Sequence, residues 1–93
     1  MNVIVITGRL GKDPDAKYSP QGNLWANVSV AEGGDNPNWF EMKCFGKTAE
    51  VLQSYGTKGR KVAIHGRMRQ ESYEKDGETR KVWRLIADRN EFL

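Results

Sequence analysis

The stretch Asn38–Tyr55 constrains the fold of this chain most, because its hydrophobic pattern changes period at Gly46. Before the glycine, residues alternate between two faces, which is the period of a β-strand. After the glycine, apolar residues follow the spacing of a short helix that covers a core: Ala49, Val51, Leu52 and Tyr55. A chain of 93 residues has room for one modest core. We therefore expect residues 1–93 to form a single domain in which a strand leads directly into a helix.

The predicted strand Asn38–Phe45 has two unlike faces. One face carries Phe40, Met42 and Cys44 and suits a core. The other face interleaves two large rings with charge: Trp39, Glu41, Lys43 and Phe45. A core does not easily accommodate that charge, and a solvent-facing strand has little reason to carry two rings. Rings beside a lysine suit a single strand of nucleic acid, because rings stack on bases and cations neutralise phosphates.

Two further strands precede this one. The run Asn2–Leu10 is short and rich in β-branched residues, which predicts a strand buried on both sides, with a bulge or bend at Gly8. Gly11–Gly22 has the composition of a loop. Asn23–Ala31 alternates between two sets of residues. The inward set is Leu24, Ala26, Val28 and Val30, and the outward set is Trp25, Asn27 and Ser29.

The chain after the helix predicts two more strands and a projecting hairpin. Gly56 is placed as a left-handed cap that ends the helix. Arg60–Met68 has the pattern of a fourth strand, and Val82–Leu93 that of the last strand. Between them, Arg69–Trp83 predicts a long hairpin arm, with the strong turn pair Asp76–Gly77 at its tip.

These elements predict an all-β fold. Five strands, with one short helix between strands 3 and 4 and a protruding hairpin between strands 4 and 5, describe a small, closed, antiparallel barrel. A five-stranded Greek-key barrel of the oligonucleotide/oligosaccharide-binding (OB) type places its helix in that position. A β-sandwich is the alternative, and the single helix at this position counts against it.

Composition limits the classes of function. The balance of 15 Lys and Arg against 12 Asp and Glu permits a polyanionic partner without requiring one. Cys44 is the single cysteine, so we expect no internal disulfide and no cysteine-based metal site. We also expect no cofactor. No stretch approaches the length of a membrane span, and the first residues lack the features of a signal peptide. We expect a cytoplasmic protein without a membrane partner.

Several motifs, taken together and in order, resemble the bacterial single-stranded DNA-binding protein family. They are Thr7–Pro14, Ala26–Ala31, Trp39–Val51 and Gly66–Arg69. Each motif alone is weak, but the ordered set covers essentially the whole chain. The resemblance implies an OB-fold protein that coats single-stranded DNA during replication, recombination and repair, close to the nucleoid, without reading sequence. It also implies self-association, usually as a homotetramer, with a dimer as the other possibility.

The resemblance also implies site residues. In the family pattern, the rings that stack on bases match Trp39, Phe45 and Tyr73. The basic positions near the DNA match Lys17, Lys47, Arg69 and Arg80, and the alternation of the strand adds Lys43 to them. Two roles fit Trp25 equally well: it extends the stacking surface, or it covers one end of the barrel.

A second set of residues is predicted at an oligomer interface. Trp83 lies in the region where the family makes a subunit contact, which is an alternative to a DNA contact. Phe40 belongs either to the core or to that interface. His65 is more often a satisfied polar residue than a metal ligand, and we expect its partners to be subunit contacts.

The chain departs from the family pattern at two places. The connection Glu32–Pro37 carries no ring, whereas most members have an aromatic residue after the second strand, so one stacking platform is missing. The family usually continues into a glycine-rich tail with an acidic tip that recruits other enzymes, and this sequence stops at Leu93. We expect a tail-less or shortened form without tail-mediated partners.

Two other classes of function compete with strand coating. An enzyme is disfavoured, because Cys44 and His65 have no third catalytic partner and no glycine-rich phosphate loop occurs. An OB-fold accessory module for primosome assembly or replication restart, which recruits proteins through the barrel surface, is the second alternative. The retained rings Trp39 and Phe45 favour strand coating over that module.

Overall fold

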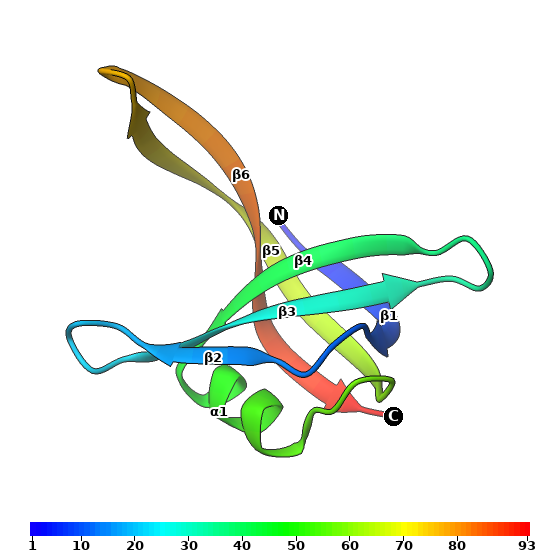
Figure 1. The fold of residues 1–93 in the computed structure, drawn as a ribbon. Coiled ribbons are helices and arrows are strands. Elements are labelled where there is room, and N and C mark those ends of the chain that lie inside the picture. The colour runs from blue at the N-terminus through cyan, green and yellow to red at the C-terminus, as the bar shows by residue number, and fades with distance from the viewer.

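The computed structural model describes residues 1–93, and its strands close into a barrel (Figure 1). The elements in chain order are β1 (Ile4–Leu10), β2 (Asp15–Tyr18), β3 (Leu24–Glu32), β4 (Asn38–Phe45), α1 (Gly46–Tyr55), β5 (Lys61–Lys75) and β6 (Glu78–Phe92). The strand order is β1-β5-β6-β4-β3-β2, and β1 also pairs with β3, so five of the six strands form a ring. The all-β barrel, its helix after Asn38–Phe45 and its protruding hairpin are confirmed.

One pair of neighbouring strands is parallel, which corrects the expectation of a wholly antiparallel barrel. β4 runs parallel to β6 from Met42, opposite Leu85, to Cys44, opposite Ala87. The reason is geometric. Strand directions cannot alternate all the way round a ring with an odd number of strands, so a closed ring of five must contain at least one parallel pair.

The predicted loop Gly11–Gly22 contains a short strand, β2, that sequence analysis missed. β2 pairs antiparallel with the first half of β3, where Tyr18 lies opposite Leu24. The Ser19 N–H donates to the Asn23 carbonyl over 2.8 Å and closes the hairpin between the two strands. β2 forms because β3 extends past the ring and presents an open edge, which depends on tertiary structure rather than on the composition of the loop.

β1 is buried on one side only, not on both sides as predicted. Ile6 and Leu10 enter the core, whereas Val5 is 64% exposed. Gly8 forms no bulge against β5, because the pairing of β1 with β5 continues without a shift in register from Ile4 to Arg9. A Cβ at Gly8 would instead overlap the carbonyl oxygen of Ala31 on β3. The glycine therefore permits the close approach that closes the ring, rather than a bulge.

The core lies inside the ring and under α1. Most of the predicted inward residues of β3 and β4 are buried in it, together with Ala49 and Leu52 of the helix. Leu24 and Phe40 are only partly buried against it, and Tyr55 is exposed. Gly56 does not form the predicted left-handed cap, since its φ is −85°. A Cβ at Gly56 would lie too close to the Leu52 carbonyl, so a glycine is needed for space. The helix is too short and too polar to cross a bilayer.

The hairpin prediction is confirmed, and its two strands are continuous with the barrel. β5 and β6 pair from the barrel to the tip, where Asp76 and Gly77 have φ values of 54° and 77°. We call residues Arg69–Lys75 and Glu78–Arg84 the arm, which projects away from the ring in Figure 1. A register shift occurs at the base of the arm, between His65 and Gly66.

Candidate nucleic-acid interface

The predicted DNA-binding residues of β2, β3 and β4 lie on one side of the sheet. Directly paired residues of neighbouring strands point to the same side. The register places Lys17 opposite Trp25, and Trp25 opposite Phe45. On β4, Lys43 and Trp39 share the side of Phe45 by alternation. This side, which we call the outer face, is the outside of the barrel over β2, β3 and β4.

The strand register shows that the outer face continues onto one side of the arm. Lys43 of β4 lies opposite Ile86 of β6, which in turn lies opposite Arg67 of β5. By alternation, the next pairs on this side of the arm are Arg69 with Arg84, Glu71 with Val82, and Tyr73 with Arg80. Arg69, Tyr73 and Arg80 therefore share the outer face with Trp39 and Phe45. Lys47 lies in the first turn of α1, two residues after Phe45.

Three rings of the outer face are available for stacking. Trp39 is 59% exposed, Phe45 45% and Tyr73 46%. One side of the Trp39 ring lies against Gly11, because a Cβ at Gly11 would overlap Cζ3 of the ring. This glycine in the connection after β1 therefore sets how the ring is presented. Sequence analysis placed Gly11 in the loop and gave no signal of that contact.

Trp25 is half-buried and is flanked by two lysines. Nζ of Lys43 lies 5.4 Å and Nζ of Lys17 6.0 Å from the centre of its ring. At such distances an ammonium group is attracted to the electrons of the indole. Trp25 thus holds two cations on the outer face, whichever further role it has.

The cations of the outer face differ in their partners. Lys43 and Arg69 form no ion pair, whereas Lys17 lies 3.8 Å from Asp15, Lys47 3.9 Å from Glu50 and Arg80 3.3 Å from Glu78. Exposed pairs of this kind contribute little free energy, so an incoming phosphate can replace the carboxylate. The register adds two arginines that sequence analysis left out of the site. Arg67 pairs with Asp88 and Arg84 with Glu71.

A cavity of about 250 Å³ opens where β4 and β6 separate at the base of the arm. Asn27, Glu41 and Lys43 line it from β3 and β4, and Met68, Trp83 and Arg84 line it from β5 and β6. Glu41 is oriented by Ser29, whose hydroxyl donates to its carboxylate over 2.8 Å. The cavity therefore joins the two parts of the outer face.

The three residues predicted at an oligomer interface come from β4, β5 and β6. Phe40 is half-buried against the core. His65 is exposed on β5, opposite Val5 of β1 and Arg89 of β6. Trp83 is 59% exposed and lies opposite Gln70, on the side of the arm away from Tyr73.

The thiol of the single cysteine, Cys44, is unreactive. Burial raises the pKa of the Cys44 thiol from 9.0 to about 11. The thiol therefore stays protonated near neutral pH and is a poor nucleophile. No cluster of three or more His, Cys, Asp or Glu side chains that could hold a metal ion occurs in residues 1–93.

A closed ring of five strands, a helix after β4, and rings interleaved with cations on the outside define an OB-fold barrel with a nucleic-acid-type surface. The comparison with known families agrees. The chain belongs to the single-strand binding protein family, whose model matches residues 1–93.

The curated relatives carry the corresponding names. The chain is 32% identical, over 99% of its length, to the single-stranded DNA-binding protein of Fusobacterium nucleatum. It is 34% identical, over 80% of its length, to single-stranded DNA-binding protein 1 of a Synechocystis species. It is also 34% identical, over its full length, to single-stranded DNA-binding protein 3 of Clostridium acetobutylicum. These alignments cover 66%, 66% and 71% of the relatives' own lengths.

Proposed function

We propose that this chain binds single-stranded DNA on its outer face and protects it during replication, recombination and repair, without reading sequence and without catalysing a reaction. The observation that carries the proposal is the alignment of three exposed rings with cations that lack a carboxylate partner. Membership of the family and the printed names of the relatives support it. We place the protein in the cytoplasm, with the nucleoid.

The proposed mechanism is passive. Each base that stacks on Trp39, Phe45 or Tyr73 contributes roughly 1–3 kcal/mol. Lys43 and Arg69 neutralise phosphates and release counterions, so the affinity falls with salt by about 0.7 log units per contact for each tenfold rise in concentration. Every base has a flat face and every nucleotide a phosphate, so neither interaction depends on sequence. The bound protein lowers the free energy of unpaired DNA and traps strands that open transiently.

Titration of intrinsic tryptophan fluorescence with an unstructured thymidine oligonucleotide, at two salt concentrations, tests this function. Two of the three tryptophans, Trp25 and Trp39, lie on the outer face. We expect strong quenching that weakens as salt rises. A flat signal, together with no binding in an independent assay, would contradict DNA binding. It would favour the accessory module instead, with the aromatic surface covered by a protein.

The phosphate role of Arg69 has a matched control on the same arm. Arg69 lies on the outer face, whereas Lys81 lies opposite Ser72 on the other side of the arm, and neither forms an ion pair. We expect Arg69→Gln to reduce the slope of log affinity against log salt by about 0.7, as one phosphate contact is lost. Lys81→Gln removes the same charge and should leave the slope unchanged. Equal slopes for the two variants would remove Arg69 from the path of the DNA.

We also propose that the chain self-associates, as a homotetramer or a dimer. Val5 of β1 and Val3, which lies just before β1, are exposed, and Val5 lies opposite His65. Two exposed valines this close together suit burial against a second copy. Phe40 and Trp83 remain proposed contacts of the assembly.

A charge on this valine surface tests self-association. We expect Val5→Glu to shift the mass measured by sedimentation equilibrium toward that of the monomer, because a carboxylate is costly to bury. Gln53→Glu adds the same charge on the exposed side of α1 and should leave the mass of the wild-type assembly unchanged. An unchanged mass in Val5→Glu would exclude this part of β1 from the interface.

A further inference from the structure

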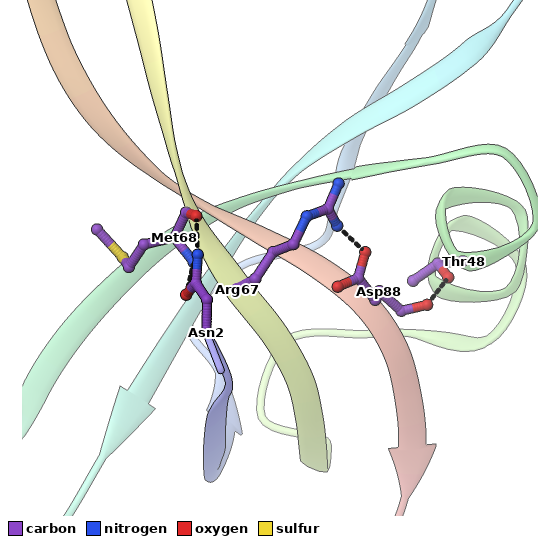
Figure 2. A network of polar contacts seen from close by, with 5 residues as sticks. All are labelled: Asn2, Thr48, Arg67, Met68 and Asp88. Carbon is purple, nitrogen blue, oxygen red and sulfur yellow. Dashed lines mark hydrogen bonds and ion pairs between the residues drawn. The ribbon is translucent and has the colours of Figure 1, made fainter.

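The N-terminal segment holds the base of the arm through one side chain. The pairing of β1 with β5 ends at Ile4, opposite Gly66, and the same register places Asn2 opposite Met68. Nδ2 of Asn2 donates to the Met68 carbonyl over 2.6 Å, and Oδ1 accepts the Met68 N–H over 3.0 Å (Figure 2). A carboxamide has the same donor and acceptor as a peptide group. The side chain of Asn2 therefore adds one more rung to the ladder where the backbone pairing has ended.

A second contact holds the opposite side of the arm base. His65 pairs with Arg89 and Gly66 with Ala87, so Asp88 is the extra residue of a bulge in β6. Its carboxylate pairs with Arg67 of β5, and its carbonyl accepts a hydrogen bond from the Thr48 hydroxyl over 2.9 Å. Figure 2 shows both contacts beside Asn2. Asp88 thus links β5, β6 and α1 at one point.

No other strand supports the arm beyond these contacts. β5 pairs with β1 only as far as Gly66, and β6 pairs with β4 only from Leu85 onward. The arm is therefore a two-stranded ribbon with both edges open. Such ribbons twist easily and have little stability of their own. The contacts at the base must then determine the direction in which the arm leaves the barrel.

We propose that Asn2 is a positioning residue that fixes the direction of the arm, and with it the place of Tyr73 relative to Trp39 and Phe45. The part of this proposal that concerns DNA rests on the function proposed above. The part that concerns the direction of the arm does not, and it can be measured without DNA.

The direction of the arm is tested by NMR on the full chain, with Asn2→Ala, Asn2→Asp and the exposed control Asn36→Ala. Residual dipolar couplings report whether arm and barrel share one alignment. In the wild type and in Asn36→Ala we expect one shared alignment. In Asn2→Ala we expect the dipolar couplings of the arm residues to disagree with the alignment that fits the barrel. We also expect the amide hydrogen of Met68 to exchange with solvent about tenfold faster. If the couplings of Asn2→Ala match those of the wild type, the proposal is wrong.

Asn2→Asp separates the hydrogen bonds from the size of the side chain. Aspartate is as large as asparagine and accepts the Met68 N–H, but its carboxylate cannot donate to the Met68 carbonyl. We expect Asn2→Asp to behave like Asn2→Ala. Wild-type couplings in Asn2→Asp would mean that the donated hydrogen bond does not hold the arm, which contradicts the mechanism.

A double-mutant cycle on oligonucleotide affinity tests the functional consequence. We expect Tyr73→Ala to weaken binding about tenfold in the wild type, but only about twofold in Asn2→Ala, because Tyr73 is already displaced there. Equal losses in the two backgrounds would show that the residues act independently, which contradicts a positioning role. No loss from Tyr73→Ala in the wild type would overturn the DNA role of the arm. The dipolar couplings would still show whether Asn2 fixes the direction of the arm.

Discussion

Replacing Trp39 by alanine is expected to weaken the binding of every single-stranded sequence alike, by about 5- to 150-fold per subunit. This range corresponds to the roughly 1–3 kcal/mol that one stacked base contributes. Trp39 is the most exposed ring of the outer face, and the loss of its side chain leaves no cavity in the core. Fluorescence anisotropy with labelled homopolymers of different bases would measure the effect.

Two variants control this experiment. Tyr55→Ala removes an exposed ring from α1, outside the outer face, and should leave the affinity unchanged. Gly11→Ala keeps the Trp39 ring but inserts a methyl group where the ring now lies, so we expect an intermediate loss of affinity. If Trp39→Ala instead abolishes assembly while each subunit keeps its affinity, Trp39 belongs to an interface between copies.

Replacing Gly66 by alanine is expected to destabilise the fold by about 3 kcal/mol, because a Cβ there would overlap the backbone carbonyl of Ile86. Backbone atoms in the middle of the β5–β6 ladder cannot move aside as the end of a side chain can. For a domain of this size, the loss corresponds to a fall in Tm of about 12–24 °C. Thermal unfolding followed by circular dichroism would measure it.

Gly34→Ala is the matched control for Gly66→Ala. Gly34 lies in the connection between β3 and β4, its φ is not positive, and nothing lies within 4 Å of an added Cβ. We expect its Tm to stay within a few degrees of the wild-type value. If Gly66→Ala were equally harmless, the bulge at the base of the arm would have to accommodate a side chain, contrary to the geometry described above.

The sequence predicts those parts of the molecule that depend on local pattern. Alternation along Asn38–Phe45 places Trp39 and Phe45 on the open face and Met42 in the core, and the structure confirms both. Asp76–Gly77 predicts the tip of the hairpin because few residue pairs favour such φ values. These features are predictable because the same few residues both encode and form them.

Other parts depend on neighbours that are distant in the sequence. β2 exists because β3 extends past the ring, and alternation within Gly11–Gly22 is too weak to reveal it. The parallel pairing of β4 with β6 follows from the odd number of strands in the ring, which strand-by-strand analysis does not consider. Whether Tyr73 or Trp83 shares the outer face depends on the register of β5 and β6.

The two short ladders of the ring divide the barrel into two half-shells. β1 pairs with β3 only at Arg9 and Leu10, and β4 pairs with β6 only over Met42–Cys44. One half-shell, β2-β3-β4, carries Trp39 and Phe45, and the other, β1-β5-β6, carries Tyr73. A small rotation of one half-shell against the other would change the spacing between these rings while it left the long ladders within each half intact.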